Sequence, residues 1–338
     1  MKKFIFFAVA ACVALASCTK NEKIDTTADQ LINFKAVVGL AQNLKSGPIS
    51  GTKYESTAPT FGAAALYYNT EDNSKDGSEW IPAFTEMLYD GSSWSAAEGY
   101  YWPKAEGSSL TTYAFSPYSV NTYMSLTTST TYGITVTDYD TEVEKDADLM
   151  LATPAKGQTS NTEAKDNGTA YDGVPTVFHH VLAYVDSMSV KTKKAVPSNQ
   201  QFLLNKIELV SINHKGTFTD AWELDDDQVT VTLYENTDGL ALSEKYQGAT
   251  TNKVGYYFLM PQTFADETQA IQITYTIKYT SSGITDGPNT KTIYLKDSFD
   301  GFEKNKAYTF NFILSGDEIL FAPSAVDWTA ESYDITVE

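Results

Sequence analysis

The sequence predicts an all-β protein built from two consecutive antiparallel β-sandwich domains. Tyr and Phe are abundant, at 22 and 17 residues, and Thr recurs throughout, which is a composition typical of strands. Apolar and polar residues alternate along many segments, and turn sequences rich in Gly and Asp separate them. No segment predicts an amphipathic helix longer than about two turns. Short strands with regular turns favour sandwiches over a parallel α/β sheet.

The alternation is clearest in a set of segments that we expect to be half-buried antiparallel strands. They are 31–38, 206–212, 228–234, 270–279, 290–296 and 307–314. Side chains two residues apart lie on the same face of a strand. The first segment therefore carries four apolar side chains on one face, namely Ile32, Phe34, Ala36 and Val38.

A segment rich in Gly, Thr, Asn, Lys and Ser, from Thr153 to Gly173, separates two groups of strands. We interpret it as a linker or as a long loop beside one. The predicted N-terminal sandwich therefore spans residues 54–170 and is completed by strand 31–38. The predicted C-terminal sandwich spans residues 171–338.

The first residues predict an export signal. Lys2 and Lys3 precede an apolar run, from Phe4 to Ala16, that is shorter than the roughly 20 residues needed to span a bilayer. The run ends in Leu-Ala-Ser-Cys at Cys18, which indicates a lipoprotein signal peptide at 1–17 and lipidation of Cys18. An ordinary signal peptide with an incidental cysteine is the alternative. Residues 18–53 then form a lipidated tether that includes strand 31–38.

The charge argues against one class of partner. The chain has 43 acidic and 24 basic residues, a formal net charge of −19, and all its basic residues are Lys. Nucleic-acid binding needs Lys and Arg to neutralise phosphate, so an acidic chain argues against it. The absence of Arg also excludes a guanidinium clamp for phosphate or carboxylate.

No motif predicts catalysis or a cofactor. His179 and His180 are neighbours in a predicted strand, so they point to opposite faces and cannot share one metal ion. Cleavage before Cys18 removes Cys12, and lipidation modifies the thiol of Cys18, so we expect no thiol nucleophile in the mature chain. No zinc-protease, nucleophile-elbow or phosphate-loop motif occurs. The facing carboxylates of a glycoside hydrolase are defined by their distance in space, so sequence spacing does not identify them.

Two acidic runs and a group of aromatic residues remain as candidate binding sites. The acidic run Asp225–Asp227 and the run around Asp140 offer carboxylates for Ca²⁺ but lack the spacing of a known loop, so solvated turns are the simpler interpretation. The aromatic residues suit either a glycan-binding platform or sandwich packing. They are Trp80, Trp94, Tyr100, Tyr101 and Trp102, and the second acidic run is Asp138, Asp140, Glu142 and Glu144.

Several spaced motifs together resemble the fimbrillin family, the type V pilins that reach the surface as lipoproteins. Their order covers essentially the whole mature chain. The motifs are Tyr101–Pro103, Tyr113–Tyr118, Asp148–Ala152, Val174–Val185, Phe258–Gln262, Tyr308–Leu314, Ile319–Phe321 and Val326–Trp328. The resemblance implies two transthyretin-like sandwiches and no catalytic residues, cofactor or metal.

The resemblance also implies assembly by donor-strand exchange. A protease removes the first strand, here 31–38, and a C-terminal strand of another subunit replaces it. The tail 332–338 has the same alternation, with Tyr333, Ile335 and Val337 on one face. Family members are often processed after an Arg, which this chain lacks, so Lys45 or Lys53 is the expected cleavage site. Ordinary edge strands within each sandwich are the alternative.

The predicted function is therefore a structural subunit of a surface fimbria that mediates adhesion. Its expected partners are other fimbrial subunits, the outer membrane through the lipid, and a host or bacterial surface receptor. The predicted location is the outer membrane at the cell surface, and the fimbria after processing. The alternative function is a monomeric surface glycan-binding lipoprotein, with a glycoside hydrolase as a third possibility.

Overall fold

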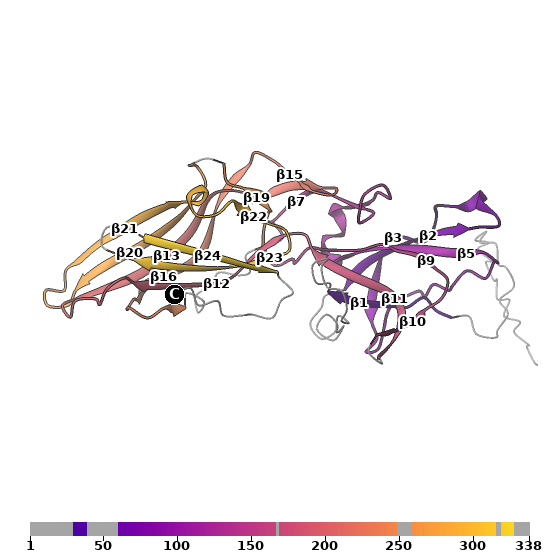
Figure 1. The fold of residues 1–338 in the computed structure, drawn as a ribbon, viewed down its shortest axis with the longest axis horizontal. Helices are drawn as coiled ribbons and strands as arrows, with labels where there is room; N and C mark the ends of the chain where they lie inside the picture. Colours follow the sequence, from indigo (N-terminus) through magenta and orange to yellow (C-terminus); the bar gives the residue numbers. More distant parts are fainter. Residues whose placement is uncertain are drawn as a thin grey trace, which may run out of the picture.

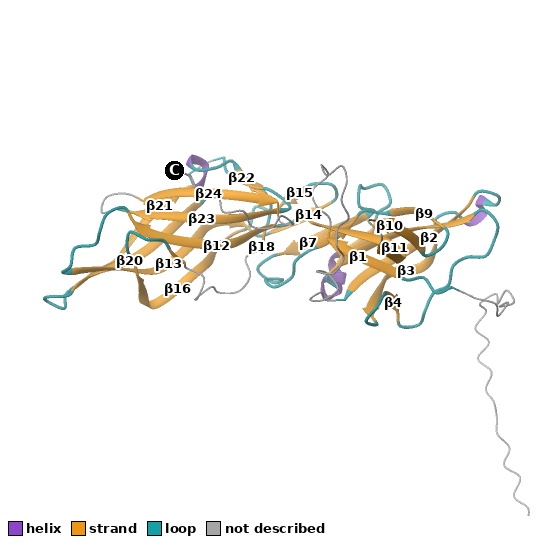
Figure 2. Ribbon diagram, turned by 60° about the horizontal axis from the view of Figure 1, so that its bottom comes forward, coloured by secondary structure: helices purple, strands orange, loops and turns teal. Residues whose placement is uncertain are grey.

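The computed structural model describes residues 30–38, 60–166, 169–248, 258–265, 267–315 and 319–327. Figure 1 shows an elongated molecule with an N-terminal and a C-terminal lobe, and Figure 2 shows that strands dominate both. The helical segments in this part of the chain are short 3₁₀ segments: η1 (Asn73–Lys75), η2 (Tyr118–Tyr123) and η3 (Leu295–Asp297). The all-β fold predicted from the sequence is confirmed.

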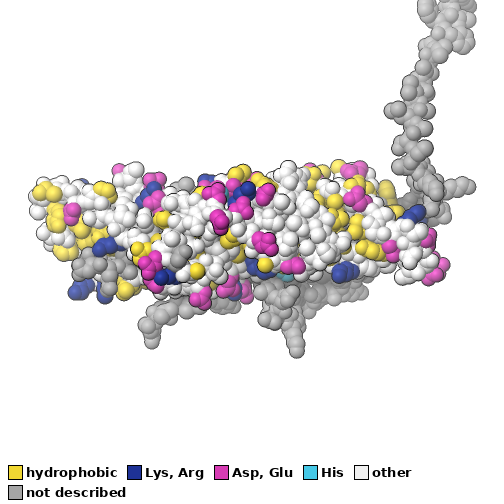
Figure 3. Space-filling view, turned by 90° about the horizontal axis from the view of Figure 1, so that it is seen from above, with side chains coloured by type: hydrophobic (Ala, Val, Ile, Leu, Met, Phe, Trp, Pro, Cys, Tyr) yellow, Lys and Arg dark blue, Asp and Glu magenta, His cyan; other side chains and the backbone are white. Residues whose placement is uncertain are grey.

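Several predicted residues lie outside the described part of the chain: Cys18, Lys45, Lys53, Tyr333, Ile335 and Val337. Within the described part, no helix is long and apolar enough to cross a membrane. Figure 3 shows acidic side chains spread over both lobes on the visible face, with Lys among them. The negative charge is thus distributed along that face and is not gathered at one point.

The N-terminal lobe contains a nine-stranded sheet that closes on itself. Its strands pair in the order β1-β4-β3-β2-β5-β8-β11-β10, and β1 also pairs with β11. We call it the closed sheet. Its members are β1 (Phe34–Val38), β2 (Phe61–Asn69), β3 (Ser78–Tyr89), β4 (Trp94–Ala96), β5 (Ser108–Ser116), β8 (Met150–Ala152), β9 (Ala155–Gln158), β10 (Thr162–Asp166) and β11 (Thr169–His180).

Strand β2 shows how the sequence builds the core of the closed sheet. The residues Ala63 and Ala65 face the interior, and their small side chains leave room for larger ones from other strands. The inner core includes the aromatic residues Phe34, Phe61, Trp94 and Phe178. Leu66, on the opposite face of β2, belongs to a different core. One strand therefore contributes to two cores because its side chains alternate.

A small sheet joins the two lobes. It pairs β6 (Met124–Leu126) and β7 (Ile134–Asp140) with β14 (Lys215–Phe218) and β15 (Trp222–Leu224), in the order β15-β14-β7-β6. The core beside it draws side chains from both parts of the chain, among them Phe115, Val136, Tyr139, Val181, Leu182, Phe218 and Met260. The indole nitrogen of Trp222 donates to the carbonyl of Val181 at 2.6 Å. The lobes are thus connected by shared strands and a shared core.

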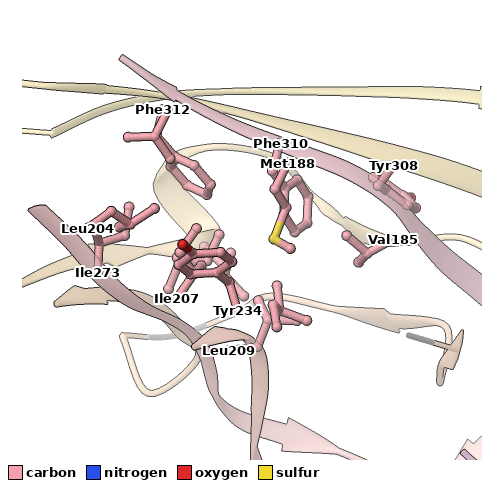
Figure 4. Packing of buried hydrophobic residues seen from close by; sticks show 14 of the residues in the cluster. Val185, Met188, Leu204, Ile207, Leu209, Tyr234, Ile273, Tyr308, Phe310 and Phe312 are labelled. Carbon is pink, nitrogen blue, oxygen red and sulfur yellow. The ribbon is translucent and has the colours of Figure 1, made fainter. Parts of the chain in front are cut away.

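The C-terminal lobe is formed by two sheets packed face to face. One contains β12 (Ala183–Thr192), β17 (Gln247–Gly248), β18 (Phe258–Leu259), β23 (Lys306–Leu314) and β24 (Ile319–Asp327); the other contains β13 (Gln200–Asn213), β16 (Gln228–Ala241), β20 (Ala270–Tyr279) and β21 (Thr285–Tyr294). A further pair is β19 (Gln262–Thr263) with β22 (Gly301–Phe302). In Figure 4, Met188 and Phe310 from the first sheet lie opposite Ile207 from the second. This arrangement is a β-sandwich.

The predicted boundary at residues 170 and 171 falls inside β11. That strand pairs with β1, β8 and β10, so the pairing of the closed sheet continues to His180. The division into two transthyretin-like domains stays a prediction.

Candidate functional site: the seat of the first strand

Strand β1 lies between two neighbours that are distant in sequence. It runs parallel to β11, from Phe34 opposite Val174 to Val38 opposite Phe178. On its other side it pairs antiparallel with β4, where Phe34 is opposite Trp94. We call the surroundings of β1, formed by β4, β11, residues 100–102 and Asn161, the strand seat. Because β1 connects β4 to β11, it is the strand that closes the sheet.

The apolar face of segment 31–38, which consists of β1 and the residues that lead into it, points into the core of the closed sheet. Ile32, Phe34 and Ala36 are 2%, 1% and 0% exposed. Val38 is partly buried against the same core. The structure thus brings together all four residues that the sequence places on one face. Val37, on the opposite face, is also buried, which the alternation alone did not predict.

Phe34 belongs to a cluster of aromatic side chains in this core. The centroid of its ring lies 6.0 Å from the ring centroid of Phe61, in an edge-on arrangement. The ring centroid of Phe61 in turn lies 5.1 Å from that of Trp94 and 5.4 Å from that of Phe178. Edge-on pairs add to the stabilisation that comes from burial alone. Phe34 is therefore the main side-chain anchor of β1.

The backbone before β1 is held from both sides. The amide of Ile32 donates to the carbonyl of Tyr100 at 2.7 Å, and the amide of Trp102 donates to the carbonyl of Gln30 at 3.2 Å. On the other side, the amide of Val174 donates to the carbonyl of Asn33 at 2.7 Å. On the same side, the Asn161 side chain forms hydrogen bonds with the backbone of Asn33 and Leu31. The sequence analysis did not identify this residue. No sequence signal identifies it, because its partners lie 128 and 130 residues away.

Gly173 permits the close approach of β11 to β1. Its φ is +153°, in a region that residues with a side chain rarely adopt. A Cβ at this position would lie 2.9 Å from the carbonyl oxygen of Asn33 and 3.0 Å from the carbonyl carbon of Phe34. A glycine therefore allows the two backbones to meet where β11 begins to pair with β1.

The two acidic runs come together at one histidine. The His214 Nδ1 lies 2.9 Å from Asp140 Oδ1, and its Nε2 lies 3.3 Å from Asp227 Oδ2. Burial alone would lower the pKa of His214, but the two carboxylates raise it above its ordinary value. Among the described residues, no group of His, Cys, Asp or Glu has an arrangement that would hold a metal. One residue of each acidic run thus meets His214 beside β7 and β14, in the small sheet that joins the lobes, and the contact is an ion pair when His214 is protonated.

The adjacent histidines contact different partners. His179 Nε2 lies 3.0 Å from Thr153 Oγ1, whereas His180 Nδ1 lies 2.8 Å from Asp148 Oδ1. Burial lowers the pKa of His179, and the charges of His180 and Lys304 lower it further. The side chains of His179 and His180 thus have separate partners.

The candidate aromatic platform is divided by the fold. Trp94 and Trp102 are buried, and Tyr100 is half-buried. Trp80 and Tyr101 are 36% and 48% exposed, and the indole nitrogen of Trp80 donates to the carbonyl of Tyr101 at 2.8 Å. The five residues therefore do not share one exposed face.

Comparisons with known proteins show which solved structures this fold is similar to. The fold is similar to a fimbrial protein from Bacteroides vulgatus ATCC 8482, with a TM-score of 0.59 and 16% identity over 88% of this chain and 99% of that one. It is also similar to a putative cell adhesion protein from Bacteroides ovatus ATCC 8483, with a TM-score of 0.52 and 15% identity over 90% and 100% of the two chains. No curated protein sequence matches.

At these identities, the likeness to solved structures concerns the fold alone. The sequence itself matches the family described as fimbrillin-like over residues 51–328. That span covers most of the chain and confirms the resemblance carried by the motifs. The protein belongs to the fimbrillin-like family.

Proposed function

We propose that this protein is a structural subunit of a surface fimbria that assembles by protease-triggered donor-strand exchange and mediates adhesion. The observation that carries the proposal is the position of β1. It is a short strand near the N-terminus, its apolar face fills the core of the closed sheet, and both of its neighbours come from later in the chain. Lys45 and Lys53 follow it in the sequence.

Removal of β1 would leave a strongly unfavourable state. Burial of a large apolar side chain contributes about 1.5–3 kcal/mol, and Ile32 and Phe34 are both almost fully buried. The sheet would also gain two open edges, at β4 and β11, whose backbone groups would lack partners. A replacement strand that supplies both apolar side chains and backbone partners is therefore strongly favoured.

The C-terminal tail has the composition for such a replacement. Strand β24 ends at Asp327, and the tail that follows carries Tyr333, Ile335 and Val337 at alternate positions. These side chains match the period at which Ile32, Phe34 and Ala36 enter the core. The proposed donor is therefore the segment 332–338 of another subunit, with further fimbrial subunits as partners.

The N-terminal sequence supports a route to the surface. In the proposed scheme, signal peptide 1–17 is removed and Cys18 is lipidated, which anchors the precursor to the outer membrane. Cleavage after Lys45 or Lys53 then releases the lipid and β1 together, so the anchored precursor cannot polymerise early. N-terminal sequencing of shed material tests this order, and material that begins near Cys18 would contradict it.

Limited proteolysis of the purified precursor tests the exchange. A low dose of a Lys-specific protease should convert monomers into a ladder of SDS-resistant oligomers. A variant that ends before residue 332 should be cut but stay monomeric, because it lacks the donor. The double variant Lys45→Gln and Lys53→Gln should stay monomeric without being cut there. Wild-type protein that is cut between β1 and β2 yet remains a stable monomer would overturn the proposal.

A further inference from the structure

Asn161 lies in the segment between β9 and β10, and its side chain contacts the backbone that leads into β1. The residue is 8% exposed. Its Oδ1 accepts hydrogen bonds from the backbone amide of Asn33 at 3.1 Å and from the indole nitrogen of Trp102 at 3.0 Å. Its Nδ2 donates to the carbonyl of Leu31 at 2.8 Å. A single buried amide thus bonds two residues of the strand and one residue of the wall.

Trp102 fixes the orientation of this amide. An indole N–H can only donate, so the atom of Asn161 that it contacts must be the oxygen. The backbone amide of Asn33 requires an acceptor at the same atom. With Oδ1 defined by two donors, Nδ2 is left facing the carbonyl of Leu31. The contact with Trp102 and the two contacts with the strand segment therefore agree on one orientation of the Asn161 amide.

The Asn161 amide takes the place of a neighbouring strand. In an extended chain, the carbonyl of one residue and the amide two residues later point to the same side. Leu31 and Asn33 have this relationship, and the Asn33 carbonyl on that side accepts from Val174 of β11. Pairing between β1 and β11 begins at Phe34 and Val174. Asn161 thus continues the hydrogen bonding of β11 beyond the point where its pairing with β1 starts.

Both bonds from Asn161 to the strand end on backbone atoms. They depend on extended geometry and are independent of which side chains residues 31 and 33 carry. A segment with other side chains in the same place would present the same carbonyl and amide. If no strand occupied the seat, the Asn161 Nδ2 would lose its bond to the Leu31 carbonyl, and water that entered the seat would have to replace it.

We propose that Asn161 is a sequence-independent backbone clamp for whichever strand occupies the seat. It first holds residues 31–33 of its own chain and then an incoming extended segment of another copy. The second step rests on the proposed function. Side-chain fit at the position of Phe34 selects the strand, whereas Asn161 contributes equally to every strand that is extended there.

The test compares Asn161→Ala with a matched control, Asn69→Ala. Asn69 is 7% exposed in the same lobe, and its side chain bonds Tyr67 and the backbone of residues 71, 72 and 106 instead of the strand. In the uncut protein, Asn161→Ala should speed hydrogen exchange at the Asn33 amide by about 10-fold to 100-fold, as expected for two lost hydrogen bonds. Asn69→Ala should leave that rate unchanged.

The second measurement uses protease-cut protein and two synthetic peptides, with the sequences 31–38 and 332–338. Asn161→Ala should shorten the residence time of both peptides by a similar factor. A milder variant, Trp102→Phe, keeps an aromatic ring at this position but removes the indole donor, and should shorten both residence times by a smaller factor. It also provides the readout if Asn161→Ala does not fold.

The outcomes separate the clamp from the exchange. Unchanged exchange at Asn33 in Asn161→Ala, or an equal change in Asn69→Ala, overturns the clamp. A reduced residence time for only one of the two peptides overturns its independence of sequence. A third outcome is that cut wild-type protein binds neither peptide, although the Asn33 amide still exchanges faster in uncut Asn161→Ala. That result overturns donor-strand exchange and limits the clamp to the strand of its own chain.

Discussion

The two lobes hold their sheets together in different ways. In the N-terminal lobe, the closed sheet depends on β1, which has five residues, five register partners on β11 and one on β4. In the C-terminal lobe, β13 and β16 each have 14 residues, and β24 pairs with β23 at nine positions. One short strand therefore closes the N-terminal sheet, whereas these strands of the C-terminal sandwich pair over longer stretches.

The largest expected effect comes from the central anchor of β1. Phe34→Ala should lower the free energy of unfolding by about 3–5 kcal/mol, as expected for removal of a fully buried ring. The loss should be confined to the N-terminal lobe, with faster hydrogen exchange in β4 and β11. Chemical denaturation followed by hydrogen exchange measures both.

Phe312→Ala provides the matched control, because Phe312 is equally buried in the C-terminal core. It should destabilise that lobe by a similar amount and leave exchange in β4 and β11 unchanged. If either variant loosened both lobes equally, the shared core between them would make the molecule one cooperative unit, and the comparison would fail.

The next effect concerns the contact between β1 and β11. Gly173→Ala should lower the free energy of unfolding by about 1–3 kcal/mol because of the positive φ. Crowding of the new Cβ against the backbone of Asn33 and Phe34 should lower it by a further ~1–3 kcal/mol. Gly157→Ala is the control, because Gly157 also has a positive φ but no atom lies within 4 Å of an added Cβ. Equal unfolding midpoints for the two variants would show that the close approach has no energetic weight.

The sequence predicted which side chains of segment 31–38 enter the core, but it did not predict which strands pair with β1. Alternation determines which side chains share a face, and Ile32, Phe34 and Ala36 do enter one core. Alternation carries no information on which strand lies alongside. The parallel pairing with β11 joins residues 140 positions apart, as Phe34 and Val174 show. Closure of the sheet is therefore a property of tertiary packing.

The same limit applies to the polar contacts. Two acidic runs were visible in the sequence, but their meeting at His214 depends on the pairing of β7 with β14. Asn161 had no distinguishing neighbours in sequence, because its bonds reach strand residues that precede it by more than a hundred positions. Composition and periodicity thus predict the fold class, while long-range hydrogen bonds have to be read from the structure.

The contact between the lobes should depend on pH. The raised pKa of His214 means that its contribution to stability is full below about pH 6.5 and is lost as the pH rises through the folded-state value. Burial alone would raise the pKa of Asp140, but bonds from His214 and nearby backbone amides lower it. The contribution of Asp140 is therefore full above about pH 4 and is lost as the pH falls through its lowered value.

His214→Gln should lower the free energy of unfolding by about 1.5–3 kcal/mol, the usual contribution of a hydrogen bond to a charged group. The loss should appear mainly between about pH 4 and pH 6.5. The difference in melting temperature from wild type should shrink above that range. His179→Gln should show the opposite trend, because its lowered pKa makes the native histidine destabilising at acidic pH. A difference for His214→Gln that does not vary with pH would exclude an ion-pair role.

The smallest expected effect is at the edge of the C-terminal lobe. Lys306 at the start of β23 pairs with Asp327 at the end of β24 at 2.7 Å, and the two side chains are 31% and 43% exposed. Lys306→Gln should change stability by about 0.2–1 kcal/mol, the range of exposed ion pairs. Nine backbone register pairs still hold β24, so protease resistance of residues 319–327 should be unchanged. If this substitution released β24, the C-terminal lobe would depend on one local contact at its edge, and the contrast with β1 would disappear.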